Sequence, residues 1–188
     1  FLTTGYIHNY GAIPQTWEDP TVVSDQCVEP LKGDNDPLDC CEIGSEVLNT
    51  GAIKTVKILG SLALIDDGEL DWKIIAINTE DRMASRLHDL NDVNEHLPGI
   101  LNATREWFRT YKIPAGKPAN EFAFNEEYRN VKETLATIEE CHEAWKKLVS
   151  GSLSEQFEGL PQIERAGNGV IMESDQQPPT SIPSEIHR

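Results

Sequence analysis

Apolar and β-branched residues in the first half of the chain form runs of strand length. Segments 40–47 and 52–65 are rich in Ile, Val, Leu and Thr, and the run WKIIAIN follows at 72–78. Runs of this kind, joined by short polar segments, are typical of β-strands. Because no helical segments alternate with them, the pattern predicts a small β-barrel.

Glycine residues mark the breaks in this pattern. Gly51 separates the first two runs, and Gly60 predicts a bulge or bend within the second run. The acidic segment DDGELD at 66–71 predicts a turn before the third run. Gly68 would provide the backbone conformation that this turn requires.

The second half of the chain has helical periodicity. In PGILNATREWFRTYK, at 98–112, one face collects Ile100, Thr104, Trp107, Phe108 and Tyr111. A longer helix is predicted over 131–149, with a stripe made of Val131, Leu135, Ile138, His142, Trp145 and Val149. Asn130 and Glu133 have the spacing of a capping box at its start, and Gly151 can end it.

These elements predict one domain over residues 1–151, mainly β with flanking helices. Residues 152–188 are dominated by Ser, Glu, Gln and Pro, so we expect an irregular C-terminal tail there. The chain opens on Phe1 rather than Met. We therefore expect a processed N-terminus or a fragment of a longer protein.

Charge and cysteine content narrow the possible partners. The chain has 32 acidic and 16 basic residues and a formal net charge of −16, which argues against nucleic acid or an anionic membrane as the main partner. The best apolar run, ILGSLALI at 58–65, is too short to cross a bilayer. Four cysteines without CxxC or Cys/His ligand spacing argue against zinc and favour a reducing intracellular compartment.

The stretch GDNDPLD at 33–39 places three carboxylates within six positions. Like charges this close repel one another unless solvent or a cation separates them. Pro37 pushes Asp36 toward an extended conformation, so a turn here can direct Asp34 and Asp39 toward one point with Asp36 beside them. Oxygen ligands of this kind favour Mg²⁺ or Mn²⁺, and a solvated acidic turn is the alternative.

The segment DDGELD is a second acidic turn, although its composition alone is that of an ordinary turn. Adjacent strands can bring Asp34, Asp39, Asp66 and Asp71 into one pocket. More carboxylates than one ion requires indicate a site for several metal ions. Such sites bind phosphoryl oxygens and activate water.

Candidate donors to a phosphate group occur in several parts of the sequence. They are Tyr6, Tyr10, Lys73, Tyr111 and Lys112. Each of these residues taken alone is better explained by a structural role, and Tyr111 also lies on the apolar stripe of its helix. Only their combination with the acidic turns favours binding of an anionic substrate.

Five segments together resemble a known family. The segments GYIHNYGAIPQTWEDP, GDNDPLD, LIDDGELDWKIIAIN, EWFRTYKIPAGKP and NEFAF are similar to the soluble family I inorganic pyrophosphatases of the eukaryotic type. The resemblance extends from about Gly5 to Gly151. It is specific because DxDPxD, DWK and YK occur in the family's order.

The resemblance implies a fold, a reaction and a set of metal ligands. The fold would be an OB-like five-stranded β-barrel packed by C-terminal helices, and the reaction would be Mg²⁺-dependent hydrolysis of pyrophosphate, with Mn²⁺ as a substitute ion. Asp34, Asp39 and Asp71 correspond to ligands of the ions that activate water. Asp66 corresponds to a ligand of the ions that arrive with the substrate. Asp36 corresponds to the catalytic residue that accepts a proton from the attacking water.

The resemblance also implies substrate contacts and an assembly. The phosphate-binding positions correspond to Tyr10, Lys73, Tyr111 and Lys112, and Tyr6 corresponds to a supporting residue. Members of the family are homodimers in the cytoplasm, with mitochondria as the alternative compartment.

The chain departs from the family pattern at its start. Family members carry a segment before GYIHNYG with early strands and with a lysine, a glutamate and an arginine of the active site, and this sequence begins without it. A catalytically impaired interaction protein that kept the fold is therefore the alternative function. A phosphohydrolase for another substrate and a simple acidic cation binder are two further possibilities.

Overall fold

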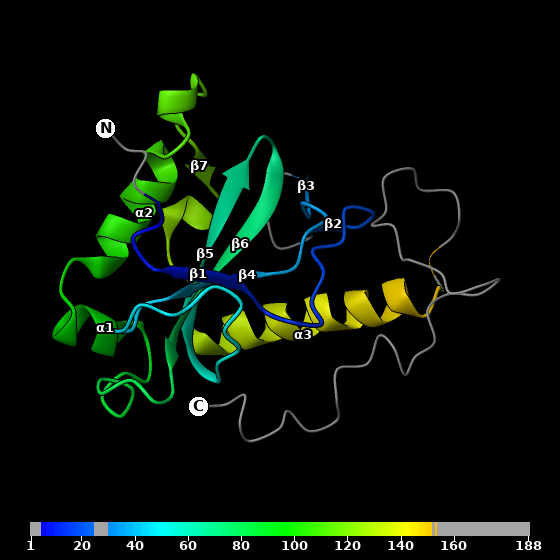
Figure 1. The fold of residues 1–188 in the computed structure, drawn as a ribbon. Helices are drawn as coiled ribbons and strands as arrows, with labels where there is room; N and C mark the ends of the chain where they lie inside the picture. Colours follow the sequence, from blue (N-terminus) through cyan, green and yellow to red (C-terminus); the bar gives the residue numbers. More distant parts are fainter. Residues whose placement is uncertain (1–4, 25–29, 152, 154–188) are drawn as a thin grey trace.

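The computed structural model describes residues 5–24, 30–151 and 153. Its main sheet has five strands in the hydrogen-bonded order β1-β4-β6-β5-β7 (Figure 1). Their bounds are β1 Asn9–Ala12, β4 Asp39–Glu42, β5 Val56–Asp66, β6 Glu69–Asn78 and β7 Glu121–Phe122. Strands β2, Val23–Ser24, and β3, Leu31–Lys32, form a separate antiparallel pair. The predicted mainly β fold with flanking helices is confirmed.

The long β5–β6 hairpin forms the centre of the sheet, where the apolar runs predicted strands. Its register shifts between Ile58 and Gly60, which confirms the predicted bulge. A side chain at Gly60 would meet the carbonyl oxygen of Arg129 at 2.6 Å, so the bulge requires glycine. At the turn between the strands, Gly68 has a φ of 91°, as expected from DDGELD.

Three α-helices occur in the described part of the chain. They are α1 Leu90–His96, α2 Ile100–Thr110 and α3 Val131–Val149. Helices α2 and α3 confirm the two predicted helices, and Asn130 and Glu133 form the predicted capping box. The short helix α1 was not expected, because only Val93 of its seven residues is buried and the apolar period is therefore weak.

Different helices cover the two faces of the sheet (Figure 1). Successive residues of β6 point to opposite faces, as in any strand. Ile75 therefore packs in one apolar cluster with Phe108 of α2. Its neighbour Ile74 belongs to a second cluster, against which Ile138 of α3 lies. The site residues of β6 share the face of Ile75.

The predicted stripe of α3 matches the buried face only in part, because Ile138 packs against the second apolar cluster and Leu135 does not. Leu135 is 50% exposed, whereas Thr134, Thr137 and Leu148 are buried. Thr134 Oγ1 donates a hydrogen bond to Ser61 Oγ of β5 at 2.9 Å, and both side chains are fully buried. Part of the contact between α3 and the sheet is therefore made by hydroxyl groups. A search for apolar residues places threonine on the exposed face of the helix and misses this contact.

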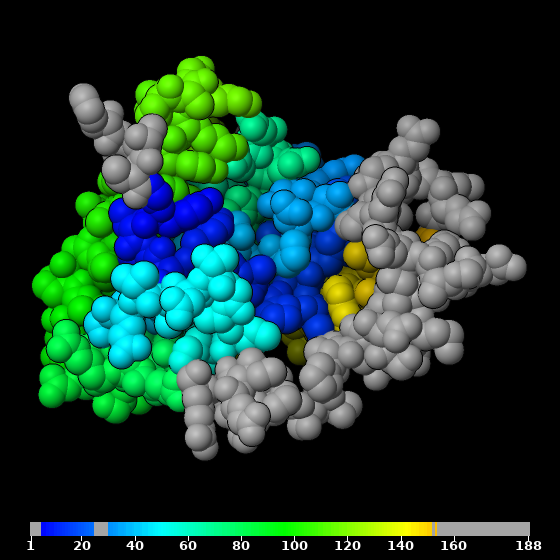
Figure 2. Space-filling view, viewed as in Figure 1, coloured from blue at the N-terminus to red at the C-terminus, as the bar shows by residue number. Residues whose placement is uncertain are grey.

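The start of the chain contacts both helical layers. In Figure 2 the blue residues of this segment lie between the green residues of the α1–α2 region and the lighter blue residues that precede β4. His8 Nε2 lies 2.6 Å from Thr104 Oγ1 of α2, and the Trp17 N–H donates to the carbonyl of Cys141 of α3 at 3.0 Å. These contacts, like strand β1, were not predicted.

Two sequence expectations concern residues beyond the described part. The irregular tail over 152–188 lies outside it except for residue 153, and so does Cys27. The described cysteines, Cys40, Cys41 and Cys141, are free thiols. In the same part of the chain, every helix is too short or too polar to cross a membrane.

Candidate active site

The acidic loop before β4 is held by backbone contacts with the segment that contains Glu18. The Glu18 N–H donates to the carbonyl of Asp36 at 2.9 Å, and the Asn35 N–H donates to the carbonyl of Glu18 at 3.0 Å. Within the loop, Asp34 Oδ1 accepts from the Asp36 N–H at 3.0 Å. Asp34 is half-buried as a result, so the loop is not simply a solvated acidic turn.

Strand β6 contributes the second group of functional side chains. Asp71 and Lys73 point to the same face, because they are two residues apart in a strand. The parallel register of β4 and β6 sets Asp39 directly opposite Lys73. The Lys73 ammonium group lies 2.5 Å from Asp71 Oδ2 and also donates to Asp39. Tyr10 of β1 completes this group, since its hydroxyl donates to Asp39 and accepts from Lys73 at 3.0 Å.

A third group forms where the end of β5 meets the end of α2. The Tyr111 hydroxyl donates to Asp66 Oδ2 at 3.0 Å, and the Lys112 ammonium group donates to the other oxygen of Asp66. Lys112 also lies 3.4 Å from Asp67, which is exposed. Tyr111 therefore combines packing on the apolar face of α2 with a polar contact at its hydroxyl.

Stacked aromatic rings connect the second group to α2. The rings of Tyr6 and Tyr10 stack with their centroids 3.8 Å apart and their planes 8° apart. Tyr6 also contacts Trp107, which stacks on Tyr111 at 4.9 Å. The two tyrosines that bond the acidic turns are thus joined through Tyr6 and Trp107.

The carboxylates of the two acidic turns lie close enough to one another for their charges to interact. Burial is the main cause that raises the pKa of Asp71 to about 6, and Lys73 opposes the increase. The charges of Asp39 and Asp66 raise this pKa further. The pKa of Asp71 is therefore raised by a carboxylate from each acidic turn.

Asp34 and Asp71 share their surroundings with a third carboxyl group, that of Glu18. Burial raises the pKa of Glu18 well above its usual range, and the charges of Asp34 and Asp71 add to the effect. Burial also raises the pKa of Asp34 to about 7, against a hydrogen bond from the Asp36 backbone. The protein thus concentrates acidic groups that are costly to ionise together without a cation.

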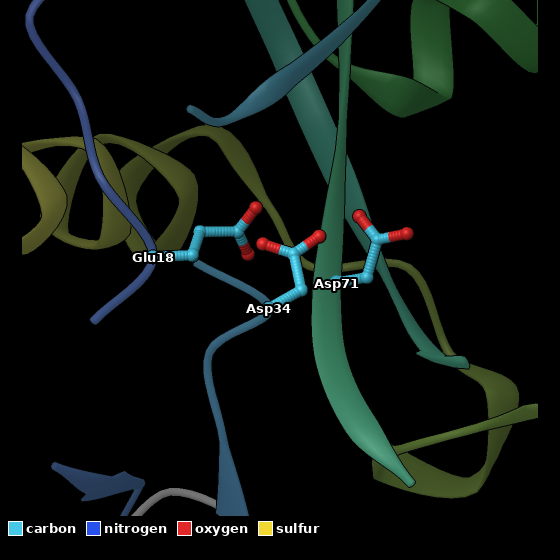
Figure 3. A group of neighbouring side chains, drawn as sticks. All are labelled: Glu18, Asp34 and Asp71. Atoms are coloured by element: carbon cyan, nitrogen blue, oxygen red, sulfur yellow. The ribbon is translucent and has the colours of Figure 1, made fainter. Parts of the chain in front are cut away.

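The donor set of this cluster fits a hard divalent cation. Each of Glu18, Asp34 and Asp71 offers an oxygen that lies within 4.8 Å of the oxygens offered by the other two (Figure 3). Glu18 Oε2 and Asp71 Oδ1 are buried and accept no hydrogen bond. Buried carboxylate oxygens are rarely left without a partner, and oxygen-only ligands suit Mg²⁺ or Mn²⁺.

The structure brings together nearly all of the site residues predicted from the sequence. The exception is the Asp36 side chain, which is exposed and acts on the cluster through its charge, by raising the pKa of Asp34. Glu18 was missed, although it stands within the quoted segment GYIHNYGAIPQTWEDP. The sequence around Glu18 gives no sign that its side chain is buried, and the burial is visible only in the fold.

Comparison with known proteins gives one consistent family. The inorganic pyrophosphatase family model matches residues 1–146. The mitochondrial inorganic pyrophosphatase of Saccharomyces cerevisiae is 61% identical over 186 residues, which is 98% of this chain and 60% of the yeast protein.

Solved structures support the same relationship. The inorganic pyrophosphatase of Schistosoma japonicum has 55% identity and a TM-score of 0.75, over 78% of this chain and 51% of that chain. The vacuolar soluble pyrophosphatase of Trypanosoma cruzi, truncated at its N-terminal domain and solved with PPi, has 44% identity and a TM-score of 0.74. That match covers 79% of this chain and 56% of the other. The chain thus spans between about half and 60% of the length of these relatives.

Proposed function

The chain belongs to the inorganic pyrophosphatase family, and on that basis we propose that the protein hydrolyses pyrophosphate to two phosphate ions in an Mg²⁺-dependent reaction. The observation that carries the proposal is the meeting of two acidic turns beside two buried or half-buried lysines. Asp39 represents the first turn and Asp66 the second, and Lys73 and Lys112 are their cationic partners. A small and highly charged substrate requires this combination, because its hydrolysis depends on positioning and charge neutralisation.

The carboxylates would hold the metal ions. We assign Asp34, Asp39 and Asp71 to the ions that activate water, and Asp66 to an ion that arrives with the substrate. The unpartnered Asp71 Oδ1 and the short distances within the cluster support this assignment. When bound, Mg²⁺ would lower the pKa of the attacking water and offset substrate charge, and Mn²⁺ could replace it.

The lysines and tyrosines would bind phosphate oxygens. Lys73 and Lys112 hold their ammonium groups beside Asp39 and Asp66, so a phosphate bound there meets a cation at each acidic turn. The hydroxyl group of Tyr10 contacts Asp39, and that of Tyr111 contacts Asp66. Tyr6 supports Tyr10 by stacking on its ring. Burial of Lys73 strengthens its attraction for an anion, since little water competes for it.

We assign Asp36 as the proton acceptor from the attacking water. Its carboxyl group is exposed, and its position in the loop is fixed by backbone contacts with Glu18. Asp36→Asn should therefore fold like the parent and lose most of its rate, about 100-fold or more, because general-base catalysis typically contributes that much. The rate is measured as phosphate release, with unfolding followed by circular dichroism.

Asp89→Asn is the matched control for this variant. Asp89 caps α1, away from the site, and asparagine caps a helix equally well. The control should keep the parental rate. Parental activity of Asp36→Asn would show that another group accepts the proton.

Phosphate release tests the function itself. The purified protein should release phosphate from pyrophosphate with Mg²⁺, release little from ATP, and release none with EDTA. Absence of release despite bound Mg²⁺ would instead favour the catalytically impaired interaction protein. None of the contacts described above favours that alternative.

Assembly and compartment are further parts of the proposal. We expect a homodimer, which light scattering after size-exclusion chromatography would test. The match to the yeast mitochondrial relative extends into the tail over 152–188 and favours mitochondria over the cytoplasm. Imaging of a fluorescent fusion would distinguish the two compartments.

A further inference from the structure

Glu18 carries a buried carboxyl group to which the proposed reaction assigns no role. The residue is only 3% exposed. Its Oε1 accepts a hydrogen bond from the Trp72 N–H at 2.9 Å, whereas its Oε2 has no partner. A glutamine would satisfy the Trp72 N–H equally well and would not bury a charge. The second oxygen and the charge of Glu18 therefore need a separate explanation.

Asp71 has the same arrangement of one bonded and one unpartnered oxygen. Its Oδ2 is bound by Lys73, and its Oδ1 is buried without a partner. Figure 3 shows the carboxyl groups of Glu18, Asp34 and Asp71 side by side, and ligand oxygens of all three lie within 4.8 Å of one another. The ion pairs of Lys73 reach Asp71 and Asp39, so its ammonium group is not the direct partner of Glu18.

The backbone holds Glu18 in this place. Gly33 packs so closely against the Glu18 backbone that a Cβ atom at position 33 would overlap the Glu18 carbonyl group. Two backbone hydrogen bonds stabilise the same contact. The Glu18 N–H donates to the Asp36 carbonyl, and the Glu18 carbonyl accepts from the Asn35 N–H. The backbone of the acidic loop is therefore joined directly to that of Glu18, which keeps their carboxyl groups close to one another.

We propose that Glu18 is a further ligand of a divalent cation, which it binds together with Asp34 and Asp71 through its unpartnered oxygen. The inference rests on the proposed function, because it adds a ligand to the metal site of that reaction. It explains the buried charge and the unpartnered oxygens of Glu18 and Asp71 with one cause. A cation at this place would balance the negative charges of the three carboxylates. The hydrogen bond from the Trp72 N–H to Glu18 does not balance them.

Mn²⁺ binding tests the proposal independently of activity. The purified protein is stripped with EDTA, and free Mn²⁺ is then measured by electron paramagnetic resonance during a titration. Glu18→Gln keeps the acceptor for the Trp72 N–H and removes the charge. We expect this variant to bind Mn²⁺ at its tightest site at least about tenfold more weakly, comparable to the loss of a well-placed partner in other metal sites.

Two further variants provide the reference and the control. Asp71→Asn should weaken the same site at least as strongly. Glu42→Gln is the control, because Glu42 is also buried but lies outside the cluster. Like Glu18, it accepts backbone hydrogen bonds, from the N–H groups of Asn78 and Gly44, and the substitution removes its charge. Its affinity for Mn²⁺ should equal that of the parent.

Thermal unfolding separates a metal ligand from a structural residue. With EDTA, Glu18→Gln should be at least as stable as the parent, because it removes a repulsive charge. With Mn²⁺, its unfolding temperature should rise less than that of the parent. Glu18→Asp, which keeps the charge and shortens the side chain, should also bind Mn²⁺ more weakly and provides a second test if Glu18→Gln does not fold.

The possible results separate this inference from the proposed function. If Glu18→Gln and Glu18→Asp bind Mn²⁺ like the parent while Asp71→Asn does not, Glu18 is not a ligand and the proposed function still stands. If the parent binds no Mn²⁺, both the inference and the metal-dependent function are wrong.

Discussion

Replacement of Lys73 by methionine would test how the acidic cluster is stabilised without metal. The Lys73 side chain is 3% exposed and bridges Asp71, 7% exposed, and Asp39, 25% exposed. Burial alone would lower the pKa of Lys73, but the two carboxylates reverse the effect and raise it. The lysine is therefore charged, and its removal leaves two carboxylates without a cation.

The magnitude follows from the burial of the three groups. Removal of one partner of a buried ion pair costs about 3–5 kcal/mol, because the remaining charge stays buried. Asp39 is partly solvated, so we take the lower end, about 3 kcal/mol. With an m-value of about 2 kcal/mol per molar urea, the unfolding midpoint of Lys73→Met should fall by about 1.5 M.

The assay is urea unfolding with EDTA at pH 8, repeated at pH 5. Asp71 already has a pKa of about 6 beside Lys73, which opposes the increase, so Asp71 of the variant should be largely protonated at pH 5 and the loss should shrink. Lys54→Met, which removes an ion pair with the half-exposed Glu80, is the control and should leave the midpoint unchanged. A Lys73→Met midpoint equal to that of the parent at pH 8 would refute the reasoning.

Two further predictions concern the cluster and α3. Because burial raises the folded-state pKa of Asp34 to about 7, its ionisation costs stability as the pH rises from about 4 to 7. Asp34→Asn should therefore gain stability over the parent between pH 5 and pH 8 in urea titrations with EDTA, and a constant difference would contradict this. Asn130→Ala removes the capping bond that the Asn130 side chain accepts from the Glu133 N–H at 3.0 Å, and should cost about 0.5–2 kcal/mol in thermal unfolding. Asn102→Ala, at an exposed position inside α2, should cost nothing, and equal losses would argue against the cap.

Local patterns in the sequence predicted the elements that depend on local contacts. The β5–β6 hairpin follows from two apolar runs and the turn at Gly68, and α3 begins at the capping box of Asn130. The buried face of α3 was not predictable in the same way. Its contact with the sheet includes the buried hydroxyl pair of Thr134 and Ser61, and polar residues at an interface carry no apolar period.

The candidate site was predicted as a list of residues rather than as a geometry. The spacing of GDNDPLD and DDGELD indicated that the carboxylates meet, but only the β4–β6 register sets Asp39 opposite Lys73. Glu18 was missed because its contact with the Trp72 N–H joins residues 54 positions apart. Contacts of this length depend on the whole fold and leave no local pattern.

Crystals of the protein grown with Mn²⁺ and phosphate would test the central claim most directly. The anomalous signal of Mn²⁺ should appear between the carboxylates of Asp34 and Asp71, with phosphate oxygens beside Lys73 and Lys112. Strong Mn²⁺ peaks found only elsewhere, with Lys73 still bound to Asp71 and no phosphate beside it, would contradict the account.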